Sequence, residues 1–188
     1  MPRKKILTKD QIILSAFNLV REKGIDKLSS RSLSKTLNTS TQPIFSLFSS
    51  MDEILSSVKS KAYETYDRVV KEALNQEYKP FKAVGTAYID FAIQEPNLFR
   101  LIFMSPNDHT YSHFNIDHNY GMIIEEIKNE FKFDERLAKK LYFESWIFAH
   151  GLAVCLVTKT VNLTGDEISE MLTDVVKGTY MYISKENN

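Results

Sequence analysis

The stretch LSKTLNTSTQPIFSLF, residues 33–48, interrupts a chain that otherwise shows long runs of apolar side chains at helical spacing. A short helical segment ends near Leu37, polar residues follow at 38–42, and Pro43 begins a second apolar turn. Asn38 tolerates the left-handed backbone of a tight turn better than most residues other than glycine. Pro43 suits the first turn of a helix, where its missing amide hydrogen has no intrahelical partner. The pattern predicts two short helices joined by a tight turn.

A helix-turn-helix needs a small residue where its helices cross, a tight turn, and a polar outer face on its second helix. Ser34 is the small residue, and Ser40 is expected to cap the second helix. Of the side chains expected outside, Gln42 can pair with adenine in a major groove. An exposed polar helix end in an unrelated helical domain would show the same pattern. The side chains expected to face inward are Leu33, Leu37, Ile44 and Phe48, and those expected outside are Thr39, Thr41, Gln42 and Ser46.

The composition indicates a helical protein and argues against a membrane-spanning segment and an intrachain disulfide. The 188-residue chain has 6 glycines and 5 prolines, and it lacks the run of ~20 apolar residues that a membrane span needs. Its single cysteine, Cys155, agrees with a reducing cytoplasm, and the N-terminus lacks the apolar core of a signal peptide. Residues 1–60 hold 10 Lys and Arg against 5 Asp and Glu, whereas residues 61–188 hold 14 against 19. This asymmetry is typical of a nucleic-acid-binding end, although ordinary surface variation produces it too.

Apolar periodicity and capping signals predict nine helices and no strand. Gly24 is a natural end for the first helix, and residues 104–115 are expected to form a loop. The expected helices cover 8–24, 30–37, 41–48, 50–74, 80–91, 97–103, 116–131, 134–158 and 164–184.

Five short elements follow one another in the first 55 residues, namely Glu22-Lys23-Gly24, Ser29-Ser30, Asn38-Thr39-Ser40, the helix Pro43–Phe48, and Ser50–Leu55. In order and spacing they resemble the E-x-G end, Thr/Ser pair, G-V-S-like turn, Y-x-H-F helix and S-K-E-x-L start of TetR-family transcriptional regulators. The resemblance implies an all-α, nine-helix architecture. Residues 1–50 would form a three-helix DNA-binding helix-turn-helix domain, and residues 51–188 a ligand-binding and dimerisation domain.

The same resemblance places the DNA contacts in the first third of the chain, with three departures from the family pattern. Asn38 replaces the usual turn glycine, which should be tolerated. Phe45 replaces a tyrosine whose hydroxyl contacts phosphate, and Met51 replaces a lysine, so two backbone contacts are missing. The basic arm before residue 6 could compensate through the DNA backbone or the minor groove. The residues assigned to DNA are Arg3, Lys4, Lys5, Ser30, Arg31, Thr39, Ser40, Thr41, Gln42, Phe45 and Ser46.

Two apolar stripes near the C-terminus, within 141–156 and 168–182, predict the dimer interface. A pair of such helices from each subunit would build a four-helix interface. The alternative is that both stripes fill the core of the monomer. The residues assigned to the interface are Leu141, Ala149, Leu152, Ala153, Leu156, Met171, Leu172, Val175, Thr179 and Tyr182.

A W-x-x-x-H-G motif, Trp146 with His150 and Gly151, resembles one C-terminal subgroup of these regulators. Trp146 and His150 share a helix face and could line a cavity for a small apolar or aromatic effector. Each of these side chains could also belong to an ordinary core. The pocket candidates are Tyr88, Phe91, Phe99, Phe103, Phe114, Trp146 and His150.

The histidines at 109, 113 and 118 lie in the expected loop, so no metal site is predicted there. The sequence also shows no phosphate-binding glycine loop and no nucleophile–base pair, so neither a cofactor nor an enzyme is expected. The resulting prediction is a cytoplasmic, homodimeric, ligand-responsive regulator, expected to be a repressor, that binds a pseudo-palindromic double-stranded DNA operator. The alternatives are a small-molecule-binding protein and a protein-interaction module of the same fold without effector-controlled DNA release.

Overall fold

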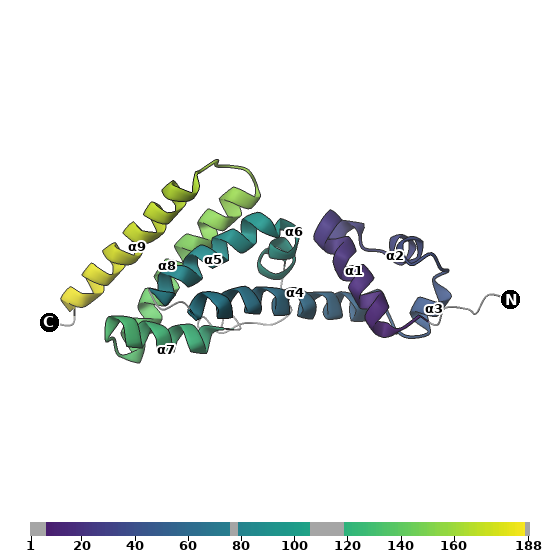
Figure 1. Cartoon of the computed structure of the whole chain (residues 1–188), viewed down its shortest axis with the longest axis horizontal. Helices are drawn as coiled ribbons and strands as arrows, with labels where there is room; N and C mark the ends of the chain where they lie inside the picture. The colour runs from purple at the N-terminus through teal and green to yellow at the C-terminus, as the bar shows by residue number, and fades with distance from the viewer. Residues whose placement is uncertain (1–6, 76–78, 106–118, 187–188) are drawn as a thin grey trace. The chain divides into compact units, whose positions relative to one another are not determined.

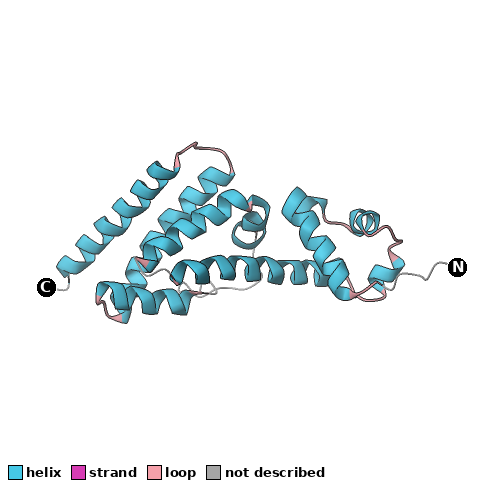
Figure 2. Cartoon of the chain, viewed as in Figure 1, coloured by secondary structure: helices cyan, strands magenta, loops and turns pink. Residues whose placement is uncertain are grey.

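The computed structural model describes residues 7–75, 79–105 and 119–186, and every regular element in these ranges is a helix (Figure 2). Nine α-helices and two short helices of other pitch make up this part of the chain, which confirms the all-α prediction. The chain divides into two compact units. Unit 1 comprises Met1–Thr65 and Glu95–Pro106, and unit 2 comprises Tyr66–Gln94 and Asn107–Asn188. The functional boundary expected after residue 50 stays a prediction.

Unit 1 contains the segment predicted as a helix-turn-helix. Its core holds the apolar face of the first helix, where Ile12, Ala16 and Val20 are fully buried. The elements of this unit are α1 (Lys9–Lys23), the 3₁₀ turn Ile25–Lys27, α2 (Ser30–Thr36), α3 (Gln42–Phe45), the first part of α4 (Met51–Leu74), α6 (Pro96–Phe99) and the π-helical turn Arg100–Met104 (Figure 1).

Local capping explains where the first two helices begin. The Thr8 hydroxyl accepts the Gln11 amide hydrogen while the Gln11 side chain accepts from the Thr8 amide, as the capping box predicts. Ser29 and Ser32 make the same reciprocal pair at the start of α2. Gly24 ends α1 at φ 84°, a backbone conformation that favours glycine.

Unit 2 is built from the rest of α4 with α5 (Pro80–Gln94), α7 (Tyr120–Phe131), α8 (Glu135–Val157) and α9 (Gly165–Glu186). α8 packs against α5, α7 and α9, and α5 also contacts α7 and α9 (Figure 1). Asp134 caps α8 through the Leu137 amide, and the predicted Thr164–Glu167 capping box precedes α9. The end of α4 and these four helices surround the interior of the unit.

Among the described helices, α8 alone has the length and apolar composition that could cross a membrane. The sequence reading did not anticipate this property. Leu137, Ala138, Leu141 and Ala153 of this helix are fully buried against the rest of unit 2, as in the core helix of a globular protein. Packing within unit 2 therefore accounts for part of the apolar composition of α8.

Candidate nucleic-acid interface and ligand cavity

The turn after α2 has the backbone conformation predicted for it. Asn38 lies in the left-handed region at φ 51°. The Thr39 amide donates to the Ser34 carbonyl over 3.0 Å, which closes the turn. Ser34 itself is buried, and its hydroxyl donates to the Arg31 carbonyl. Ser34 is therefore a small, buried side chain just before the turn.

The second helix of the motif, α3, is shorter than predicted, since only Gln42–Phe45 is α-helical. Its N-cap is Thr41, which has helical backbone angles and makes no side-chain capping bond, so the prediction that Ser40 caps the helix is wrong. The Thr41 carbonyl instead accepts directly from the Ile44 and Phe45 amides. Pro43 does lie in the first turn, as predicted. The Ser46 hydroxyl donates to the Pro43 carbonyl over 2.8 Å at the other end.

The two faces of this segment differ sharply in burial. The three apolar anchors Leu33, Ile44 and Phe48 are at most 3% exposed, whereas Leu37 is only half-buried. Phe45 points outward and is 41% exposed. The predicted DNA-contacting side chains are exposed at Arg31, Ser40, Thr41, Gln42 and Ser46 and half-buried at Ser30 and Thr39, and Arg3, Lys4 and Lys5 lie outside the described residues.

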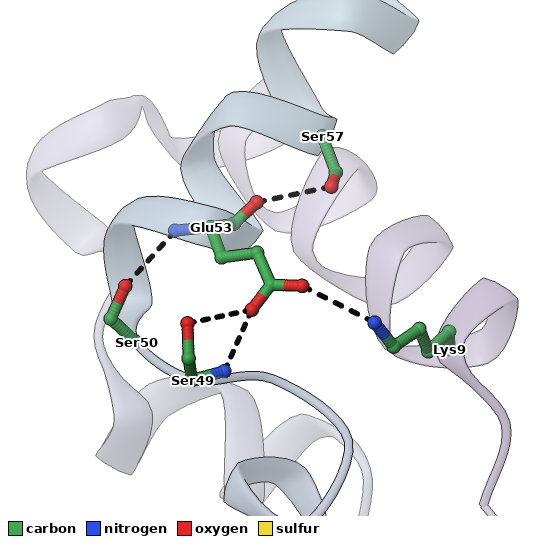
Figure 3. A network of polar contacts seen from close by, with 5 residues as sticks. All are labelled: Lys9, Ser49, Ser50, Glu53 and Ser57. Carbon is green, nitrogen blue, oxygen red and sulfur yellow. Dashed lines mark hydrogen bonds and ion pairs between the residues drawn. The ribbon is translucent and has the colours of Figure 1, made fainter.

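Glu53 at the start of α4 connects this helix with Lys9 of α1 and with the residues between α3 and α4 (Figure 3). Its Oε2 accepts from the Ser49 amide at 2.7 Å and from the Ser49 hydroxyl at 2.9 Å, and its Oε1 lies 3.2 Å from Lys9 Nζ. The Ser50 hydroxyl accepts from the Glu53 amide, as half of the predicted capping box. Hydrogen bonds from Ser49, followed by that from Lys9, lower the pKa of Glu53. Lys9 Nζ also lies 4.9 Å from the centre of the Phe48 ring, so this network holds the end of the motif against α1 and α4.

A second polar cluster fixes α6 against the end of α1. The Arg21 guanidinium and the Glu95 carboxylate form a bidentate ion pair, with Nε 2.7 Å from Oε2. The hydrogen bonds that Arg21 donates to Glu95, together with the charge of that carboxylate, raise the pKa of Arg21. The Asn97 side chain donates to the Arg21 carbonyl and lies next to Gly24. Sequence reasoning missed these residues because the ion pair joins positions 74 apart, with no local pattern to mark it.

Unit 2 contains a cavity of about 210 Å³, lined by residues of all five of its helical segments. Its buried walls are aromatic and aliphatic, whereas Lys79 and Lys177 on its lining are exposed. A cavity of this kind suits a small ligand whose body is mainly apolar. The walls include Tyr66 of α4, Tyr88 of α5, Ile123 of α7, Trp146 of α8, and Leu172 and Val176 of α9.

A row of rings from α5 and α8 lies at the cavity wall. Tyr88 Oη lies 2.8 Å from His150 Nδ1, and Trp146 stacks on the His150 ring with centroids 5.0 Å apart. Burial lowers the pKa of His150, so its neutral form is favoured and Nδ1 can accept a hydrogen bond from the Tyr88 hydroxyl. Two other polar atoms of the lining, Ser145 Oγ and Trp146 Nε1, are buried without a hydrogen-bond partner among the described residues.

The structure brings only part of the predicted pocket set together. Tyr88 and Trp146 line the cavity. His150 is not part of the lining, but it is hydrogen-bonded to Tyr88 and stacked on Trp146. Phe91 is buried against Tyr66 instead. The remaining candidates are Phe99 and Phe103, which pack on each other in unit 1, and Phe114, which lies outside the described residues with the histidines at 109, 113 and 118.

The predicted dimer residues divide into an interior and an exterior set. Leu141, Ala149, Leu152, Ala153 and Leu172 are buried within the chain itself, as in the core alternative. Of the other predicted residues, Leu156, Val175 and Thr179 are half-buried, whereas Met171 and Tyr182 are exposed. Ile147 and Met181, which the prediction did not name, are exposed apolar side chains of the same two helices.

No protein-family model matches the sequence, and no curated protein matches it either. Among solved structures, a TetR-family member from Streptomyces coelicolor A3 matches with a TM-score of 0.61. The match covers 89% of this chain and 96% of that chain at 16% sequence identity. The chain has the fold of a TetR-family protein. The subgroup suggested by the W-x-x-x-H-G motif stays a prediction.

Proposed function

We propose that the protein is a DNA-binding transcriptional regulator that acts in the cytoplasm as a ligand-responsive homodimer and represses its target. The observation that carries the proposal is the outer face of the turn and α3. There, exposed hydrogen-bonding side chains surround Gln42 while Ile44 is fully buried behind them. An uncharged amide at this position suits an adenine edge, and the neighbouring hydroxyls suit phosphate oxygens. The TetR-like fold supports the same function.

Selection from a random duplex library tests DNA reading without a known operator. The expected product is a pseudo-palindrome whose half-sites are separated by whole helical turns. Affinity for this duplex should fall steeply with salt, because each neutralised phosphate adds about −0.9 to the slope of log K against log salt. Failure to enrich any sequence, or an affinity independent of salt, would exclude the proposed function.

Gln42→Ala separates base reading from backbone binding. Affinity for the selected duplex is expected to fall about tenfold or more, while affinity for an unrelated duplex changes little. Gln94→Ala, at an exposed glutamine of unit 2, is the matched control and should leave both affinities unchanged. An equal loss on both duplexes would show that Gln42 contacts the backbone rather than a base.

The proposed dimer uses the outward faces of α8 and α9. Ile147 and Gly151 share one face of α8, and Met171, Gly178 and Tyr182 share one face of α9. The three large side chains are 37–59% exposed, and a Cβ added at either glycine meets no atom within 4 Å. A second copy of the chain would cover this apolar surface. Small residues within it allow helices to approach closely.

Sedimentation velocity of two arginine variants tests this face. Gly151→Arg places a charge in the proposed interface and should convert the dimer to a monomer. Gly121→Arg, at another exposed helical glycine with open space around it, is the control and should remain dimeric. A dimer that persists in Gly151→Arg would move the interface away from this face.

A further inference from the structure

We propose that the cavity of unit 2 binds a small apolar molecule through a hydrogen-bond acceptor, held by the indole N–H of Trp146 and the hydroxyl of Ser145. This inference deepens the proposed ligand response and rests on it, because it names the chemical class of the effector. The geometry behind it lies entirely within unit 2.

The two donors stand out because buried polar atoms are nearly always hydrogen-bonded. Ser145 is 8% exposed, and its Oγ has no partner among the described residues. Helical serines and threonines usually bond the carbonyl four residues earlier. Ser57 and Thr173 of this chain do so, at 3.0 and 2.7 Å, whereas Ser145 does not. Ser145 belongs to the cavity lining, so its unused hydroxyl can bond a ligand there.

The indole of Trp146 adds a stricter requirement. Its Nε1–H is buried with no partner in the described part of the chain, and because it can only donate, only an acceptor can satisfy it. The ring is held in place because it stacks on His150, with an angle of 14° between the planes, and His150 is itself bonded to Tyr88. A ligand acceptor would therefore meet a donor whose direction is already set, which reduces the entropy lost on binding.

The remaining lining limits the size and charge of the ligand. A dry apolar cavity of about 150 Å³ accepts benzene. The 210 Å³ found here suits a molecule somewhat larger, with about eight to ten non-hydrogen atoms. The lining includes three lysines, Lys79, Lys82 and Lys177, against the single carboxylate of Glu130, which already accepts from the Phe81 amide. A cationic amine would meet donors and positive charge. The oxygen of a ketone, ester or ether would instead accept a hydrogen bond from these donors.

Trp146 is the only tryptophan in the chain, so its indole Nε1–H gives a single cross-peak in a ¹H–¹⁵N spectrum. Acetophenone and its hydrocarbon isostere α-methylstyrene form a matched pair of probes, since both carry a phenyl ring but only the ketone accepts a hydrogen bond. Acetophenone is expected to move the indole cross-peak downfield in a saturable manner. α-Methylstyrene should bind about five- to tenfold more weakly and cause no downfield shift, in line with one buried hydrogen bond.

Three variants, measured by isothermal titration, assign the preference to these donors. Trp146→Phe and Ser145→Ala should each reduce the ketone-to-hydrocarbon affinity ratio at least twofold and leave the affinity for α-methylstyrene within twofold. Ser184→Ala is the matched control, because its hydroxyl is also buried with no partner among the residues that the structure describes, but Ser184 is not part of the cavity lining. This variant should keep the wild-type ratio.

The proposal is overturned if neither probe binds, if both bind equally, or if the ratio survives in both donor variants. Tighter binding of the cation of 2-phenylethylamine than of acetophenone would overturn it too. These outcomes are independent of DNA binding. A regulator that selects an operator but shows no ketone preference loses only this inference, whereas a ketone-selective protein without an operator loses only the proposed function.

Discussion

Both units cap helices with polar side chains, but they differ in the buried donors that remain. In unit 1, Thr8, Ser29 and Ser50 bond backbone amides close in sequence, and exposed groups such as Gln42 remain on the surface. In unit 2, Ser145 and Trp146 bury donors that lack partners among the described residues. Unit 1 thus completes its own hydrogen bonds and offers the rest to a large polar partner. Unit 2 leaves donors inside a cavity, where only a small molecule can reach them.

The largest expected effect tests whether the stability of unit 1 depends on its buried anchor rather than on the exposed ring beside it. Ile44→Ala removes a fully buried side chain and should lower the free energy of unfolding by about 2–5 kcal/mol. Phe45→Ala, one residue further and 41% exposed, should change it by no more than about 0.5 kcal/mol. Urea unfolding followed by circular dichroism measures both. Equal losses would show that the exposed ring of Phe45 also packs.

The next effect concerns the turn, where backbone conformation decides stability. Asn38→Ala places a residue less tolerant of φ 51° in the left-handed region and should cost about 1 kcal/mol. Asn38→Gly should be neutral or slightly stabilising, since glycine adopts this conformation freely. The same unfolding measurement applies. If glycine destabilised as much as alanine, the asparagine side chain rather than the backbone would be responsible.

Signals that lie close together in the sequence predicted most of unit 1. Asn38, Pro43 and the Thr8–Gln11 pair act within one turn of chain, so their residue types were sufficient to predict the turn and the helix starts. The cap of α3 was mispredicted because Ser40 and Thr41 are both acceptable caps, and only the backbone angles decide between them.

The cavity of unit 2 could be predicted only in part, because it depends on contacts between distant helices. Tyr88 and His150 are 62 residues apart, and no periodicity pairs them. An aromatic stripe looks the same whether it fills a core or lines a cavity, so Phe91 and Phe99 were grouped with Trp146 although they pack elsewhere. The unpartnered state of Ser145 is a property of three-dimensional packing alone.

A substitution in unit 1 is expected to increase the affinity for DNA, which tests whether the surface of this unit binds a large polar partner. Phe45→Tyr adds a hydroxyl where the resemblance to TetR-family regulators implies a phosphate contact. If the proposed function is correct, the substitution should tighten binding to the selected duplex by about 1 kcal/mol, roughly fivefold. Fluorescence anisotropy measures the affinity at several salt concentrations.

Met51→Lys adds a charge instead of a hydroxyl near the DNA backbone, so the salt dependence of binding distinguishes it from Phe45→Tyr. A neutral hydroxyl displaces no counterion, so Phe45→Tyr should leave the salt slope unchanged. An added lysine should steepen the slope by about 0.9. Weaker binding by Phe45→Tyr would mean that the ring of Phe45 contacts an apolar part of the DNA.

The smallest expected effect tests the buried polar pair of unit 2 through pH. Burial lowers the pKa of His150 below its ordinary value of about 6.5. The unfolded chain therefore takes up this proton first as the pH falls, so stability is lost as the pH falls through 6.5 and the loss levels off below the folded pKa. His150→Gln, which does not titrate, should lose less stability between pH 7.5 and 5.5 than the wild type. Tyr88→Phe should keep the wild-type slope, because burial rather than the tyrosine hydroxyl lowers the pKa. Identical slopes for the wild type and His150→Gln would mean that His150 reaches solvent freely, and the stack with Trp146 would then be too loose to orient the indole donor.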